Sequence, residues 1–137
     1  MKHLWVWGWV ACLLVCGWTG CGKAAAPPSK VDCVCFLNEH PCESSRRLEA
    51  WTKEALEAAY PAELKNGRLS FRSVNYDRKE DTHFLKDYKL PFQSIVLLDA
   101  GDSKRWVRLD KLWEMIGDQE QFRKYVQEQT GKFLSGH

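Results

Sequence analysis

The chain has 137 residues, which is enough for one domain. Its apolar fraction of 45% and charged fraction of 28% are ordinary for a globular protein, and its formal net charge is +2. A charge this close to neutral excludes a nucleic-acid interface built on a strong basic excess, so we expect no nucleic-acid partner. Six cysteines occur, three within residues 1–21 and three within residues 33–42. That is not the scattered pattern of a disulfide-stapled mini-protein.

The N-terminus has the layout of an export signal. A short positive start precedes an uncharged run over residues 4–18, which fits a signal-peptide core and is shorter than the roughly 18 residues that a spanning helix needs. The run ends in Trp18-Thr19-Gly20-Cys21. This resembles a bacterial lipobox, in which small residues precede a cysteine that receives diacylglycerol, although Trp18 replaces the usual leucine-like residue. The sequence predicts a lipoprotein signal peptide over residues 1–20, with an uncleaved signal anchor as the alternative.

A lipid on Cys21 would tether the protein to a membrane of the bacterial cell envelope, with the domain outside the cytoplasm. Residues 21–30 then comprise the lipidated cysteine and a linker, because alanines and two prolines keep this stretch extended. We expect the folded domain over residues 31–131 and a short tail over residues 132–137. The expected partners are the membrane and a protein of the envelope.

The domain is predicted to mix strands and helices. Residues 31–37 form a short apolar run typical of a buried strand. Residues 44–60 carry apolar residues at helical spacing, and Pro61 lies just beyond the end of this helix. The other predicted elements are a strand over 68–76, a short helix over 78–88, a hairpin of 94–98 and 104–109, a helical turn over 110–116, and a last helix over 118–130 that Gly131 follows.

This order defines the fold class. A βαβ unit, a connecting helix, a β-hairpin and a closing helix predict an α/β domain with one mixed four-stranded sheet that helices cover on both faces.

The element order, with a cysteine between the first strand and the first helix, resembles the thioredoxin fold over about residues 31–130. Residues 62–71 (Ala-Glu-Leu-Lys-Asn-Gly-Arg-Leu-Ser-Phe) and Tyr88-Lys89-Leu90 ahead of an apolar strand resemble the small bacterial thioredoxin-like proteins labelled nitrophenyl-compound nitroreductase subunit. The resemblance implies a thioredoxin-like fold and leaves the substrate open. Thioredoxin-like proteins usually have Cys-x-x-Cys where this chain has Cys42-Glu43-Ser44-Ser45. Thioredoxins have a cis-proline where this chain has Gln93, two residues after Pro91.

Cys42 is the candidate catalytic thiol. A cysteine at a helix N-terminus meets the positive end of the helix dipole and free N–H groups, which favour the thiolate and lower its pKa. Arg46 and Arg47 would add to this effect if they face the loop, and Ser45 could donate a hydrogen bond to the thiolate. A serine does not attack a mixed disulfide, so release of a product requires another thiol. The alternative is a loop cysteine without chemistry.

Cys33 and Cys35 alternate with Val34, so their side chains share one face of a strand. They are either small core residues or resolving thiols for Cys42. A third reading joins Cys33, Cys35, His40 and Cys42 as ligands of zinc or copper, but the spacing does not match a usual zinc pattern. We therefore expect no metal and no cofactor.

Two functions remain open at this stage. One is a membrane-tethered thioredoxin-like lipoprotein that acts through Cys42 in thiol–disulfide exchange or thiol-dependent partner binding. If it is an enzyme, it is a thiol–disulfide oxidoreductase-like protein with one active-site cysteine. The other is a non-enzymatic adaptor lipoprotein that uses the same scaffold as an interaction platform.

Overall fold

The computed structural model describes residues 27, 28 and 30–136. The predicted signal peptide, the lipidation site Cys21 and most of the linker lie outside the described residues. Within the described part, no helix is long and apolar enough to cross a membrane.

Four strands form one mixed sheet in the order β2-β1-β3-β4. The central strand β1 (Val31–Leu37) is parallel to β2 (Leu69–Asn75) and antiparallel to β3 (Ser94–Asp99). β3 pairs with β4 (Asp102–Arg108) as an antiparallel hairpin. The predicted α/β class and the mixed four-stranded sheet are confirmed.

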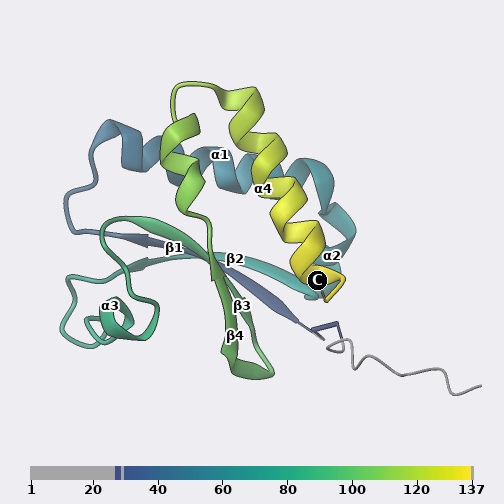
Figure 1. The fold of residues 1–137 in the computed structure, drawn as a ribbon, viewed down its shortest axis with the longest axis horizontal. Coiled ribbons are helices and arrows are strands. Elements are labelled where there is room, and N and C mark those ends of the chain that lie inside the picture. The colour runs from purple at the N-terminus through teal and green to yellow at the C-terminus, as the bar shows by residue number, and fades with distance from the viewer. Residues whose placement is uncertain (1–26, 29, 137) are drawn as a thin grey trace, which may run out of the picture.

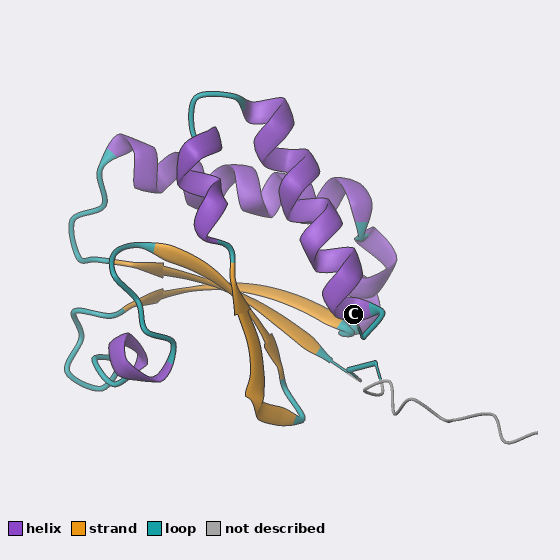
Figure 2. Cartoon of the chain, in the orientation of Figure 1, coloured by secondary structure: helices purple, strands orange, loops and turns teal. Residues whose placement is uncertain are grey.

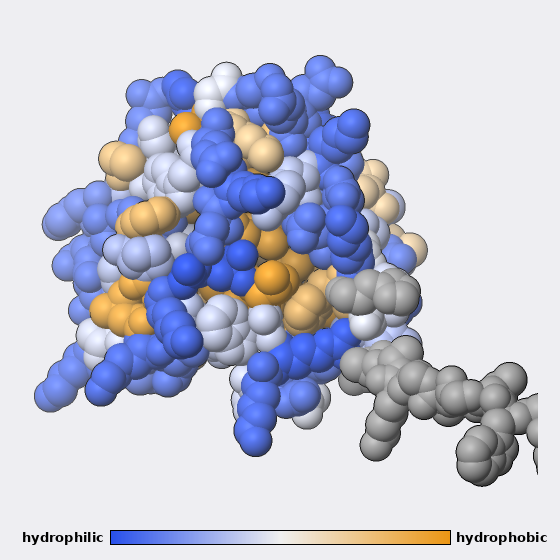
Figure 3. Space-filling view, in the orientation of Figure 1, coloured by the Kyte–Doolittle hydropathy of each residue, from blue (hydrophilic) through white to orange (hydrophobic). Residues whose placement is uncertain are grey.

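Helices lie on both faces of this sheet (Figures 1 and 2). The long helices α1 (Glu43–Ala59) and α4 (Gln119–Leu134) cover one face, together with α2 (Pro61–Asn66) and the 3₁₀ helix η1 (Asp110–Met115). The short helix α3 (Phe84–Asp87) lies on the other face. Figure 3 shows a largely hydrophilic surface in this view, with apolar colour gathered at the position of α3 and over the middle of the molecule.

The two faces carry two separate cores. Because side chains alternate along a strand, β1 sends Val31, Cys33 and Cys35 toward α1 and α4, and Val34 and Phe36 toward α3. All five are fully buried. The α1/α4 core also contains Leu48, Leu56, Leu97, Leu112, Phe122 and Val126. On the α3 face, Phe36 packs against the rings of Phe84 and Tyr88 at centroid distances of 5.3 and 5.6 Å.

The predicted helix over residues 78–88 is mostly wrong. Helix α3 spans only Phe84–Asp87. Turns precede it, in which an N–H bonds to the carbonyl three residues earlier, for example the Asp81 N–H to the Arg78 carbonyl at 2.9 Å. Side chains in this stretch bond to backbone carbonyls: the Thr82 hydroxyl donates to Lys79 at 3.1 Å. Such local bonds give the backbone an alternative to helix, which explains the shortening.

The chain after α1 forms an unpredicted helix. The sequence predicts only that Pro61 lies just beyond α1. In the structure Pro61 also occupies the first turn of α2, where its fixed φ and missing N–H are tolerated. Gly67 ends α2 with φ of +80°, in the left-handed region that glycine adopts easily.

The predicted end of the last helix is also wrong. α4 continues through Gly131 to Leu134, and the side chains of Phe133 and Leu134 are only 6% exposed. The first three residues of the predicted tail over 132–137 therefore belong to the domain. The predicted helical turn after β4 corresponds to η1.

Candidate functional site

Cys42 lies where the sequence placed it, at the start of the first helix. It is the N-cap residue of the 17-residue helix α1, with an extended backbone (φ −72°, ψ 174°), and its side chain is exposed. Its carbonyl accepts the first intrahelical bond, from the Arg46 N–H at 3.0 Å. The thiol therefore lies beside the free N–H groups and the positive dipole end of a long helix.

Ser45 contacts this thiol directly. The Cys42 Sγ lies 3.2 Å from the Ser45 Oγ, and Ser45 itself is fully buried. The hydroxyl of Ser45, followed by the backbone N–H groups of Ser45 and Ser44, lowers the pKa of Cys42. The predicted pairing of Cys42 with Ser45 therefore forms a local environment that favours thiolate.

Arg46 and Arg47, near the start of α1, have different surroundings. Arg47 forms an ion pair with Glu43 one helical turn earlier, so its charge is already engaged. Arg46 is exposed. Hydrogen bonding rather than an arginine contact is therefore the main local cause of the lowered pKa of Cys42.

Cys33 and Cys35 are in a different environment from Cys42. Both are fully buried in the α1/α4 core, and all three described cysteines are free thiols. Burial raises the pKa of both thiols, and the nearby negative charge of Glu49 raises the pKa of Cys35 further. The structure brings Cys42 and Ser45 together and leaves the two candidate resolving thiols in the core.

A metal site finds no support in the geometry. Among the residues that the structure describes, no group of three or more histidine, cysteine, aspartate or glutamate side chains is placed to hold a metal ion. His40 and Cys42 are exposed, whereas Cys33 and Cys35 point into the core.

The loop before β3 lies at the same end of the sheet as Cys42. Ser94, the first residue of β3, pairs with Phe36 near the end of β1. Phe92 is 45% exposed and meets the ring of Trp113 edge-on at 5.5 Å. The Trp113 indole N–H donates to the Gln93 carbonyl at 2.8 Å, and the Ser94 hydroxyl donates to the Phe92 carbonyl at 2.8 Å. All peptide bonds in the described part are trans, including the bond before Pro91.

A cleft of about 440 Å³ borders residues 38–42, the loop between β1 and α1 that ends at Cys42 and is here called the thiol loop. The end of β1 and Pro41, the residue before Cys42, line it together with the last residues of β2 and the turn after them. Arg72 and Arg78 contribute positive charge, and Glu39 and Asp81 negative charge. The sequence prediction missed this cleft because no short motif links residues 37–41 with residues 72–81.

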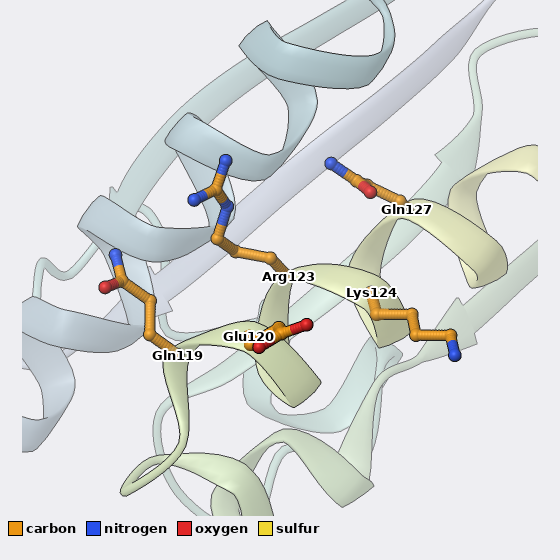
Figure 4. Close-up of a pocket in the computed structure, with 5 residues that line it drawn as sticks. All are labelled: Gln119, Glu120, Arg123, Lys124 and Gln127. Carbon is orange, nitrogen blue, oxygen red and sulfur yellow. The ribbon is translucent and has the colours of Figure 1, made fainter.

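A second cavity, of about 590 Å³, lies on α4, and none of its lining residues belongs to the thiol loop (Figure 4). Its five lining residues are Gln119, Glu120, Arg123, Lys124 and Gln127. Gln119 donates to Glu54 at 3.0 Å and Gln127 to the Ala55 carbonyl at 3.0 Å, so this row joins α4 to α1. These contacts give the cavity wall a structural role.

Comparisons with known proteins assign no family. No family model matches the chain, and no curated protein matches it. Among solved structures, the chain is similar to one described as "Structure of a malarial protein", with 15% identity and a TM-score of 0.40. The match covers 66% of this chain and 97% of the other. A similarity this weak carries no argument about fold family or function.

Proposed function

We propose that this protein is a membrane-tethered, thioredoxin-like lipoprotein of the cell envelope that acts through Cys42 in thiol–disulfide exchange or thiol-dependent partner binding. The observation that carries the proposal is the environment of Cys42: an exposed thiol at the N-cap of a long helix, 3.2 Å from the Ser45 hydroxyl. Reactive cysteines are found in accessible sites of this kind, where the thiolate is stabilised.

The element order supports the thioredoxin-like part of the proposal. A βαβ unit, a connecting helix, a hairpin and a closing helix occur in that order, with Cys42 between β1 and α1. The proposal does not depend on a resolving thiol in the domain, because Cys33 and Cys35 are buried.

The chemistry would then proceed through a mixed disulfide. The Cys42 thiolate attacks one sulfur of a partner disulfide, a new S–S bond forms, and the other partner sulfur leaves as a thiolate. A second thiol, from the partner or a small thiol, attacks the mixed disulfide and releases Cys42 as a thiolate. The partner disulfide is thereby exchanged rather than reduced by this chain alone.

The position of the thiol suits a tethered protein. The chain enters the sheet at Val31, the first residue of β1, and Cys42 follows the opposite end of that strand. A seven-residue strand is roughly 20 Å long at about 3.3 Å per residue. A lipid on Cys21 would therefore hold the domain by the end that lies away from the thiol.

Alkylation mapping tests this proposal. The full chain, purified without reductant, would be treated with iodoacetamide across a pH series, then digested and mapped by mass spectrometry. We expect the Cys42 peptide to alkylate well below the free-cysteine pKa of about 8.5 and to form a reducible adduct with a small disulfide. A Cys42 that reacts as slowly as a model thiol, or that forms no such adduct, would contradict the proposal.

The second candidate function is a non-enzymatic adaptor, which the exposed Phe92 over Trp113 favours. Large exposed aromatic side chains are frequent at protein interfaces. A pull-down from envelope extract with the wild-type chain and with Cys42→Ser separates the two candidates. Partners held only by the cysteine form through reducible bonds favour exchange, and partners held equally by both forms favour the adaptor.

A further inference from the structure

The outer side of β2 is an open sheet edge. β2 pairs with β1 and with no other strand of the described chain, since it stands first in the order β2-β1-β3-β4. The Tyr76 N–H donates to the Leu37 carbonyl at 3.0 Å, just past the end of β2. Backbone groups alternate sides along a strand, so those of Phe71 and Ser73 point away from β1. Such unpaired groups are a template for another strand.

This open edge is continuous with the cleft beside the thiol loop. The same cleft is lined by Arg72 and Ser73 of β2 and by Pro41, next to Cys42. A segment that lies along the C-terminal half of β2 would therefore reach the neighbourhood of the thiol. Its backbone would pair with the strand edge, which is the usual mode of recognition by strand addition.

The charge at this edge favours an acidic segment. Arg72 is exposed on β2, and within the described residues neither it nor Arg78 forms an ion pair. Arg72 belongs to β2 itself, whereas Glu39 and Asp81, which line the same cleft, belong to the loop after β1 and the turn after β2. Antiparallel pairing of β2 with the same strand of a second copy, centred on this strand, would oppose Arg72 to itself. That repulsion disfavours self-association at the edge.

The loop before β3 lies on the other side of β1 from β2 and has fewer backbone groups free to pair with a peptide. The carbonyls of Phe92 and Gln93 already accept hydrogen bonds from Ser94 and Trp113. That side presents an apolar surface, whereas the β2 side presents unpaired backbone groups and a cation.

We infer that the open edge of β2 binds an extended peptide segment with an acidic residue opposite Arg72 and so presents a protein partner to Cys42. The inference rests on the proposed function for the role of the thiol, but the binding itself needs no thiol chemistry. It therefore assigns the partner class: a polypeptide with an exposed, acidic, extended segment.

Peptide selection tests this inference. A phage library of random eight-residue peptides without cysteine would be selected on the full chain under reducing conditions. We expect the enriched peptides to be rich in strand-forming residues and to carry aspartate or glutamate. Binding of the best peptide, made synthetically with a fluorescent label, would be measured by polarisation. Arg72→Glu should weaken it by about tenfold and should select basic peptides in a repeated experiment, whereas Phe92→Ser should leave it unchanged.

A matched pair of variants tests the strand edge itself. Ser73→Pro removes the outward N–H and is compatible with an edge strand, so it should abolish peptide binding. Ser73→Ala loses only the hydroxyl that bonds to Glu49 and should bind as the wild type does. Circular dichroism checks that each variant folds, and Arg72→Glu decides the case if Ser73→Pro does not fold.

The outcomes also separate this inference from the proposed function. Any of three results would overturn the inference, even if Cys42 proves reactive. These are a selection that enriches no peptide, enrichment of peptides without acidic residues, and binding that depends on Phe92 and not on Arg72. Acidic peptides that bind at Arg72 while Cys42 reacts as an ordinary thiol would support the binding edge and contradict the exchange function alone.

Discussion

The two ends of the sheet differ in how firmly they are closed. At the end where β1 begins, the Arg68 guanidinium donates to the Leu134 carbonyl at 3.1 Å, and the Tyr60 hydroxyl donates to the Gln127 carbonyl at 2.6 Å. Helices α2 and α4 both finish at this closed end (Figure 1). At the other end, Cys42 and Phe92 are exposed and the thiol loop borders a cleft.

This difference separates stability from chemistry. Burial and long-range hydrogen bonds at the closed end join segments that are more than 60 residues apart, for example Arg68 with Leu134. At the other end, here called the open end, Cys42 and Phe92 are exposed, so substitutions of exposed side chains there should cost little folding free energy. If stability and chemistry are separated in this way, changes at the closed end cost more folding free energy than changes beside the thiol.

Truncation after Gly131 should destabilise the domain most. It removes Phe133 and Leu134, which are both 6% exposed, and the carbonyl that accepts from Arg68. Burial of two large apolar side chains is worth roughly 3–6 kcal/mol. Urea unfolding of the full chain and the truncated chain measures the loss. A chain that ends after Ser135 is the control, and a truncated chain within about 1 kcal/mol of it would show that the closed end does not hold the fold.

The end of α4 shows why sequence patterns predict elements better than their boundaries. Glycine after an apolar pattern usually marks a helix end, so the sequence predicts that the last helix ends before Gly131. In the structure Gly131 lies within α4, where a Cβ would be 2.7 Å from the Tyr60 hydroxyl oxygen. The glycine makes room for a tyrosine that is 71 residues away in the chain, and that contact has no local signal.

Gly131→Ala should destabilise the domain by about 1–3 kcal/mol through this overlap. The Tyr60 ring is held by its bond to the Gln127 carbonyl, so it cannot move aside without losing that bond. In a Tyr60→Phe background the nearest remaining ring atom is 3.9 Å from the new Cβ. There the same substitution should stabilise, because alanine favours helix over glycine by about 1 kcal/mol. Thermal unfolding of the four variants measures the coupling, and additive effects would contradict it.

The site was predictable only where it is local. Cys42 and Ser45 are three residues apart at the start of a helix, so helical geometry alone brings them together. The burial of Cys33 and Cys35 also follows from an apolar strand, although the sequence left their role open. The cleft beside Pro41 depends on the parallel pairing of β1 with β2, and that pairing joins residues far apart in the chain.

Ser45→Ala should have the smallest effect on stability and a clear effect on reactivity, which is the pattern expected of the open end. The loss of one hydrogen bond to an exposed thiol should change the unfolding free energy by less than about 1.5 kcal/mol. The hydroxyl is the largest cause of the lowered pKa of Cys42, so its removal raises that pKa. At any pH below the new value a smaller fraction of the thiol is ionised, and the alkylation profile moves to higher pH.

Ser44→Ala is the matched control, because among the described contacts its hydroxyl forms no bond to the thiol. Alkylation rates of the Cys42 peptide between pH 5 and 9, taken around the free-cysteine pKa of about 8.5, would give the profile of each variant. If Ser45→Ala and Ser44→Ala shift it equally, or not at all, the helix N-terminus alone sets the reactivity of Cys42. If only Ser45→Ala shifts it, the Ser45 hydroxyl has a defined chemical role: it keeps the exposed thiol of Cys42 in its reactive form.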